Sequence, residues 1–437
     1  MIRNFMYYYK PYMKLLIGVI IGTFAMAGLD LIFPVMVREL INRVLPSKNM
    51  TVIFGGAAIL LLLYIFEFII SYSVQYYGHI MSASIEHDMR NDLFSHIETL
   101  SFRYFDNEKT GQLLSRITSD VTEVSELAFR GPNDVLLCAV IMTGPIVAML
   151  IMNWTLAILI GGLLIGKAFH TVKINRKMKD AFRKNRVKAG EVSARAEESL
   201  SGIRLIKAFA MEDFERKRFC GKSRELRNTR FNSYKLVAYF SGSINFFTNF
   251  INVVVLLAGG YMISVDILTL PDFVAFLLYV NIFMRPVFRL TILAEVYQRG
   301  MAGFSRFEEI MNTKPSIENP EMPLVFNKVR GDICFKDMSF GYDDNRLVLH
   351  HISLDIPAGK TIAFVGETGT GKSTLANVLL RFYDPSSGEI LIDGKDIKEY
   401  CQQDLRKQIG IVQQDVFLFA GSILENIRAY QAAQHAA

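Results

Sequence analysis

The stretch Gly366-Glu367-Thr368-Gly369-Thr370-Gly371-Lys372-Ser373 decides the fold of the second part of this 437-residue chain. It matches G-x-x-x-x-G-K-[ST], in which glycines turn backbone N–H groups toward a phosphate at the start of a helix. The apolar run Thr361–Val365 before it predicts a strand, and the run Thr374–Leu380 after it predicts a helix. Lys372 is placed to reach the β and γ phosphates, and the Ser373 hydroxyl to ligate Mg²⁺. The motif predicts a nucleotide site, which a kinase, a GTPase or a transport motor would each show.

The composition outside this loop points to a membrane. Hydrophobic residues make up 51% of the chain and charged residues only 21%, below the ~25% usual for soluble domains. Such apolar content excludes an intrinsically disordered chain. The four cysteines lie far apart, with no C-x-x-C pair, so a disulfide scaffold and a zinc module are both disfavoured. We expect a membrane protein that carries a soluble domain.

Six apolar runs precede the soluble part, and a bilayer core needs roughly 20 apolar residues per helix. The predicted spans are residues 15–37, 52–74, 135–152, 156–170, 236–263 and 273–290. The first run could instead be a cleaved signal peptide, because basic residues precede it and Ala25-Met26-Ala27 fits an A-x-A cleavage site. The apolar run continues well beyond that site, which favours a span. The fourth run is short and carries Lys167, which could snorkel to the interface.

Basic residues indicate the orientation of these spans. Residues 167–235 contain 20 Lys and Arg against 8 Asp and Glu, whereas residues 264–272 contain no Lys or Arg. Residues 1–14 and 78–133 carry three and five basic residues. By the positive-inside tendency these three segments face the cytoplasm, although Arg38, Arg43 and Lys48 favour the opposite side weakly. We expect a multi-pass protein of the cell membrane with both ends and the nucleotide domain in the cytoplasm.

The long cytoplasmic connections read as helix. Met89, Leu93, Ile97 and Leu100 recur at three- and four-residue steps, which predicts one buried helical stripe. The basic run 167–235 has interspersed acids and no aromatic stacking pattern, so a solvated helical face is favoured over nucleic-acid binding. The helix after Leu290 can continue to Thr313, where prolines break it. We therefore divide the chain into a transmembrane domain at 1–313, a linker at 314–328 and a partial nucleotide-binding domain at 329–437.

The residues around the phosphate loop resemble those of the ATP-binding cassette (ABC) transporters, specifically exporter-type half-transporters with six spans and one nucleotide domain. Residues 335–342 look like the family's opening strand, whose final aromatic, here Tyr342, stacks on adenine. Residues 381–394 are similar to the segment after the phosphate-loop helix, and residues 411–419 to the Q-loop. Gln414 takes the place of the family's glutamine, with Gln413 as the adjacent alternative. Asp384 and Asp393 are interpreted as turn residues.

This resemblance implies ATP and Mg²⁺ as ligands and a helical membrane domain followed by an incomplete α/β nucleotide domain. The implied ATP-binding residues are Tyr342, Gly366, Glu367, Thr368, Gly369, Thr370, Gly371, Lys372, Ser373, Thr374 and Gln414. The implied Mg²⁺ ligands are Ser373 and Gln414. Residues 104–116 and 197–209 resemble the two cytoplasmic loops of the family, which places coupling helices near Asn107–Arg116 and Ala208–Arg218. The implied partners are membrane lipid, a second half-transporter in a homo- or heterodimer, and an exported substrate.

The resemblance stops after the Q-loop. Family members continue with an LSGGQ-type sequence, an Asp-Glu pair after four apolar residues, and a switch histidine, none of which follows Gln414 in the sequence. Glu389–Asp393 looks like that Asp segment but has too few apolar residues and lies before the Q-loop. We therefore assign no catalytic residue, and we do not expect this chain alone to hydrolyse ATP. The alternative function is a truncated, non-hydrolysing membrane protein that binds nucleotide or associates with a full-length half-transporter.

Three charged residues in the spans bear on the substrate, although they do not identify it. Glu67 within the second run suggests a polar cavity, because a carboxylate is costly in lipid. Arg285 and Arg289, near the inner end of the last run, could contact lipid headgroups or an anionic cargo, or could instead snorkel or form a structural ion pair.

Overall fold

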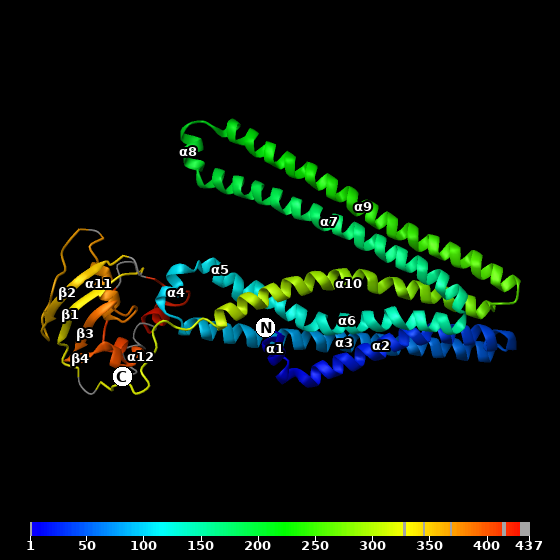
Figure 1. Cartoon of the computed structure of the whole chain (residues 1–437), viewed down its shortest axis with the longest axis horizontal. Helices are drawn as coiled ribbons and strands as arrows, with labels where there is room; N and C mark the ends of the chain where they lie inside the picture. The colour runs from blue at the N-terminus through cyan, green and yellow to red at the C-terminus, as the bar shows by residue number, and fades with distance from the viewer. Residues whose placement is uncertain (1, 327–328, 344–345, 368, 413–416, 429–437) are drawn as a thin grey trace. The chain divides into compact units, whose positions relative to one another are not determined.

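The computed structural model describes residues 2–326, 329–343, 346–367, 369–412 and 417–428. Its secondary structure is mostly helical up to Met311 and contains a small sheet beyond it (Figure 1). The α-helices are α1 (Ile2–Tyr7), α2 (Met13–Glu39), α3 (Met50–Thr99), α4 (Phe102–Asn107), α5 (Thr110–Ser115), α6 (Val121–Met152), α7 (Trp154–Ser201), α8 (Ile203–Ala208), α9 (Glu212–Ser264), α10 (Leu270–Met311), α11 (Lys372–Leu379) and α12 (Gln402–Lys407). Short 3₁₀ or π turns lie at Lys10–Tyr12, Leu40–Val44, Leu45–Ser47, Arg116–Asp120 and Ile397–Glu399. The strands are β1 (Ile333–Phe340), β2 (Leu349–Ile356), β3 (Ser387–Ile392) and β4 (Lys395–Asp396).

The chain forms two compact units. One contains residues 4–85 and 125–300, and the other contains residues 1–3, 86–124 and 301–437. We call them the span unit and the nucleotide unit and describe each by itself.

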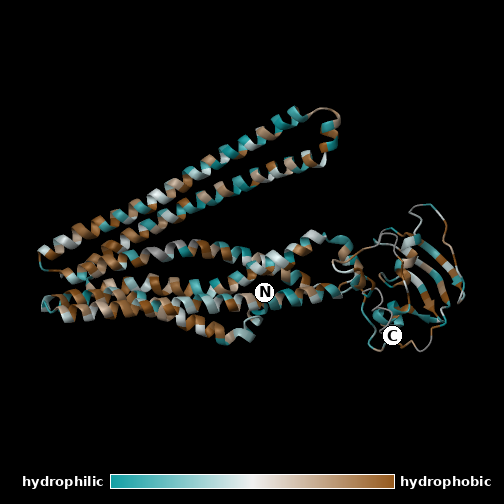
Figure 2. Ribbon diagram, turned by 180° about the vertical axis from the view of Figure 1, so that it is seen from behind, coloured by the Kyte–Doolittle hydropathy of each residue, from teal (hydrophilic) through white to brown (hydrophobic). Residues whose placement is uncertain are grey.

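The span unit contains the apolar parts of the long helices; α3, α6 and α10 each extend into the nucleotide unit. Within the described residues, five helical stretches are long and apolar enough to cross a membrane: Lys10–Ser47, Met50–Thr99, Thr110–Met152, Trp154–Ser201 and Glu212–Ser264. A shorter apolar stretch, Leu270–Phe283, begins α10. Each of the six runs predicted from the sequence lies within one of these helices or within α10. In α7 and α9, which lie side by side, apolar residues gather in one half and polar residues in the half that leads to α8 (Figure 2).

Close helix packing holds the span unit together. Its core joins α2, α6, α7, α9 and α10, and it includes the fully buried Ile160, Val255 and Phe276. Helix association in lipid depends on such van der Waals contact because lipid tails are as apolar as the side chains. Gly78 of α3 is a required small residue, since a Cβ there would lie 2.0 Å from the Phe129 ring of α6. Lys167 does not snorkel: it is 6% exposed, and its ammonium donates to Thr248 Oγ1 at 2.5 Å.

The nucleotide unit is built around an antiparallel sheet of order β2-β1-β3-β4. Ile333 of β1 pairs with Ile356 of β2 on one side and with Ile392 of β3 on the other. Phe335, Ile390 and Val378 of α11 lie in its buried core. The buried helical stripe predicted from the sequence is confirmed, because Met89, Leu93, Ile97 and Leu100 are all buried.

One predicted strand is wrong. Residues 361–367 have no strand pairing, and the side chains of Phe364 and Val365 are 47% and 93% exposed. Apolar, β-branched composition favours an extended chain, but a strand also needs a neighbour that accepts its backbone hydrogen bonds. No described strand, β1 to β4, pairs with this segment.

Candidate nucleotide-binding site

The phosphate loop ends at the first turn of α11. Gly369 and Gly371 have φ of +91° and +88°, a left-handed conformation that glycine adopts without steric cost. Gly371 is the N-cap of α11 and offers no side chain to the first-turn N–H groups. It also packs closely on β2, where a Cβ would lie 2.6 Å from Leu349 Cδ2. The loop thus leaves helix N–H groups and the positive end of the helix dipole for an anion, which fits a nucleotide phosphate.

Lys372 places its charge at this loop. Its ammonium donates to the carbonyl oxygens of Gly366 and Glu367, both at 2.7 Å, and lies 3.4 Å from Thr370 Oγ1. Ser373 follows on the exposed side of α11. The cation and the hydroxyl are therefore together at the start of one helix, the donor set that a Mg²⁺-bound polyphosphate requires.

Tyr342 lies beside the same helix. Its hydroxyl is 3.2 Å from Oγ1 of Thr374, a buried residue of α11. Its ring packs edge-to-face on Phe340 and Tyr383, with both centroid distances 5.1 Å, and remains 38% exposed. The structure thus brings together the aromatic ring and the phosphate loop, which are 24 residues apart in the sequence.

Tyr383 joins this cluster to α4. Its hydroxyl donates to Asp106 Oδ2 at 2.6 Å, and the neighbouring Phe382 stacks on Phe102 with ring centroids 4.1 Å apart. Burial, followed by the Asp106 carboxylate, raises the pKa of the Tyr383 phenol well above its usual range. The sequence places Asp106 and Tyr383 in two separate motifs, and no local signal could pair residues so far apart in the chain.

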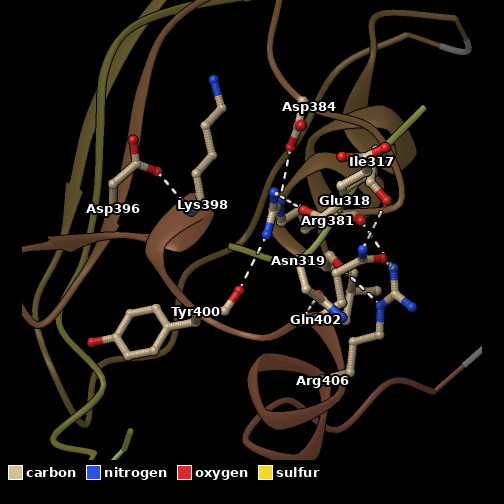
Figure 3. A network of polar contacts seen from close by, with 11 residues as sticks. Ile317, Glu318, Asn319, Arg381, Asp384, Asp396, Lys398, Tyr400, Gln402 and Arg406 are labelled. Atoms are coloured by element: carbon tan, nitrogen blue, oxygen red, sulfur yellow. Dashed lines mark hydrogen bonds and ion pairs between the residues drawn. The ribbon is translucent and has the colours of Figure 1, made fainter. Parts of the chain in front are cut away.

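A buried arginine fixes the far end of α11. Arg381 is 4% exposed and donates to Asp384 Oδ1 at 3.0 Å and to the carbonyl oxygens of Tyr400 and Glu318, both at 3.2 Å (Figure 3). Arg406 donates to the carbonyl oxygens of Leu380 and Arg381 at 3.2 and 2.9 Å. These bonds satisfy carbonyl groups at and beyond the helix end. Asp384, interpreted from the sequence as a turn residue, accepts one of the hydrogen bonds of Arg381.

Comparison with known proteins settles the family. A family model described as the ABC transporter transmembrane region matches residues 16–287, and a second model, described as ABC transporter, matches residues 349–437. The chain belongs to the ABC transporter family. It is an exporter-type half-transporter fused to an ATP-binding domain, and hence a multi-pass membrane protein.

Several relatives of this ABC transporter cover most of its length. It is 40% identical to the uncharacterized ABC transporter ATP-binding protein YwjA of Bacillus subtilis over 98% of the chain and 74% of the relative. It is 31% identical to the uncharacterized ABC transporter ATP-binding protein YknV of the same organism over 96% and 70%. It is 33% identical to the ATP-dependent lipid A-core flippase of Vibrio parahaemolyticus over 78% and 58%.

The structure describes most of the ATP-binding residues predicted from the sequence. Tyr342, Lys372 and Thr374 lie together, and Ser373 is in the same helical turn as Lys372. Thr368 and Gln414 lie outside the described residues.

Proposed function

We propose that this ABC transporter binds ATP with Mg²⁺ at the loop 366–373 and serves as the ATP-binding half of an ATP-driven exporter, paired with a second half-transporter in a homo- or heterodimer. The observation that carries the proposal is the contact of Tyr342 with Thr374, which places an exposed aromatic ring beside the phosphate loop. The two parts of a nucleotide, its flat base and its charged polyphosphate, would thus bind to groups that lie next to each other, the Tyr342 ring and the phosphate loop.

Each residue has a distinct role in this proposal. The ring of Tyr342 stacks on the base, while the first-turn N–H groups of α11 and the Lys372 ammonium hold the phosphates. The Ser373 hydroxyl ligates Mg²⁺, with Gln414 as a second oxygen donor. Bound Mg·ATP supplies the free energy that draws two nucleotide domains together in the dimer.

The direct test is ATP photolabelling of the purified full chain with an azido-ATP analogue. Replacing Lys372 by Ala removes the phosphate-binding cation, and we expect labelling to fall at least tenfold. Lys360→Ala is the matched control, because Lys360 is an exposed lysine just before the loop. Equal labelling of Lys372→Ala and Lys360→Ala would refute the assignment of the site.

A further inference from the structure

Three aromatic rings of the nucleotide unit form one cluster. Phe340, Tyr342 and Tyr383 contact one another, with ring centroids 5.1 to 5.4 Å apart. Phe340 is 3% exposed and belongs to the core of the sheet, whereas Tyr342 is 38% exposed. Tyr342 thus keeps open surface on which a base can stack, while its two neighbours lie nearly perpendicular to it, at 79° and 85°.

Three contacts set the orientation of the Tyr342 ring. Its hydroxyl is 3.2 Å from Thr374 Oγ1, and Phe340 and Tyr383 lie against the ring. Phe340 and Thr374 belong to β1 and α11, whose backbone hydrogen bonds hold them in place. Tyr383 lies beyond the end of α11, in a segment that is neither helix nor strand. Its position therefore depends on contacts made by side chains.

Helix α4 supplies those contacts. The Tyr383 hydroxyl donates to Asp106 Oδ2 at 2.6 Å, the length of a hydrogen bond strengthened by a charged acceptor. The raised pKa of this phenol keeps it a donor well above neutral pH. The preceding Phe382 stacks on Phe102 and lies under the Arg406 guanidinium, 5.0 Å from its ring centroid. Two consecutive residues are thus held by one short helix.

The hydroxyl of Tyr383 distinguishes this arrangement from simple packing. A phenylalanine would fill nearly the same volume, but only a tyrosine adds a bond to Asp106 that fixes how the ring is turned. Because the attraction between perpendicular rings depends on their relative angle, a rotation of Tyr383 would change the tilt of Tyr342. The surface offered to a base therefore depends on a carboxylate of α4.

We propose that Tyr383 is a positioning residue for base recognition, and that Asp106 holds it in place from α4. The role of Tyr383 rests on the proposed function, and it adds that α4 responds to the base of the nucleotide rather than to its phosphates. Coupling between two sites is reciprocal. If α4 strengthens the binding of a base, then a bound base must stabilise α4.

The first test compares ligands with and without a base. Azido-ATP photolabelling of the purified full chain is competed with ATP, ADP or inorganic tripolyphosphate at equal free Mg²⁺. Tyr383→Phe should weaken competition by ATP and ADP about fivefold, since a hydrogen bond to a charged group is lost, and should leave tripolyphosphate unchanged. Tyr383→Leu also removes the ring and should have a larger effect. An equal change for all three competitors, or none, would overturn the proposal.

The second test asks whether Asp106 and Tyr383 act as one unit. Asp106→Ala should weaken ATP binding by the same factor as Tyr383→Phe, and the double variant should be no weaker than either, because the two residues share one hydrogen bond. The matched controls are Tyr400→Phe, whose ring stacks on Phe326 instead, and Asp404→Ala, an exposed carboxylate of α12. Neither control should change any affinity. Additive effects of the two substitutions would overturn the link between them.

Hydrogen exchange measures the effect in the other direction. Saturating ADP should slow the exchange of a peptide that covers residues 102–107 severalfold, whereas saturating tripolyphosphate should not. The slowing should disappear in Tyr383→Phe. Equal protection by tripolyphosphate and ADP would show that α4 responds to the phosphates, and it would overturn the proposal.

Lys372→Ala separates the role of Tyr383 from the proposed function. If Lys372→Ala abolishes ATP photolabelling while Tyr383→Phe keeps the full preference for ATP over tripolyphosphate, the nucleotide site stands and the role of Tyr383 fails. If Lys372→Ala labels as strongly as Lys360→Ala, the proposed function fails, and the role of Tyr383 fails with it.

Discussion

Asp393 resembles a catalytic carboxylate in sequence, since it follows the apolar run of β3. In the structure it has φ of +50°, and its carboxylate accepts hydrogen bonds from the backbone N–H groups of Arg330, Gly331 and Asp332 at 2.8 to 3.0 Å. It therefore lies in the turn between β3 and β4, as the sequence predicts, and connects that turn to residues 330–332. Burial by itself raises the pKa of this carboxyl, but the three N–H groups and the Arg330 charge together lower it below its usual value.

Stability at low pH tests this role. A lowered folded-state pKa contributes stability above the unfolded value of about 3.9, and that stability is lost as the pH falls through the folded pKa. Asp393→Asn should therefore reduce the unfolding free energy of the nucleotide unit by roughly 1 kcal/mol at pH 7 and flatten its decline below pH ~4. Pulse proteolysis of the full chain in urea, scored on fragments beyond residue 320, measures this. An unchanged acid limb would contradict the role given to Asp393.

Single residues differ in how far the sequence predicts them. Lys372 and Tyr342 are predicted because one sits in a local motif and the other at a fixed distance from it. The contact between Phe102 and Phe382 is not predicted, because packing between residues so far apart in the chain leaves no local sequence pattern.

At the scale of the elements, the position of α11 depends on contacts at its C-terminal end as well as on the phosphate loop at its N-terminal end. Arg381 connects the residues after α11 to the carbonyl oxygens of Glu318 and Tyr400 (Figure 3). Removing one partner from a buried network leaves polar groups without hydrogen bonds, which costs about 1–3 kcal/mol for each group. Arg381→Ala should therefore destabilise the nucleotide unit by roughly 2–5 kcal/mol.

The measurement is again pulse proteolysis in urea, with Lys395→Ala as control because Lys395 is exposed on β4. Arg381→Lys keeps the charge but lacks the planar fork, so it should fall between the two. If Arg381→Ala were as stable as Lys395→Ala, the network would not hold α11 in place.

Helices with a strong hydrophobic periodicity were predicted correctly. The strand expected at residues 361–365, which was predicted from its composition alone, was not. The stripe from Met89 to Leu100 repeats every three to four residues, and a helix forms its hydrogen bonds within itself. Residues 361–365 look like a strand, but a strand depends on a partner that its own sequence does not specify. The helices of the span unit also form their hydrogen bonds internally, so the lengths of their apolar runs are enough to predict where they lie.

At the scale of the whole molecule, the distribution of basic residues indicates which side of the membrane each helix end faces. The proposed inner segments, 1–14, 78–133 and 167–235, carry 28 Lys and Arg, whereas the proposed outer segments carry 3. The long inner segments count less under the positive-inside tendency, but residues 264–272 contain no Lys or Arg, and this short loop gives the clearest signal. We propose six spans with both ends in the cytoplasm.

Cysteine labelling in intact cells tests this topology, in a background in which Cys138, Cys220, Cys334 and Cys401 are replaced. Ser264 at the end of α9 and Ser193 within α7 are both exposed, so a cysteine at either position is open to a reagent. Ser264→Cys should react with a membrane-impermeant maleimide added outside, because residues 264–272 face outward. Ser193→Cys should react only after the cells are permeabilised, because it lies in the basic cytoplasmic segment. ATP photolabelling of both variants verifies that they are folded. External labelling of Ser193→Cys with protection of Ser264→Cys would invert the topology and place the nucleotide site away from cytoplasmic ATP.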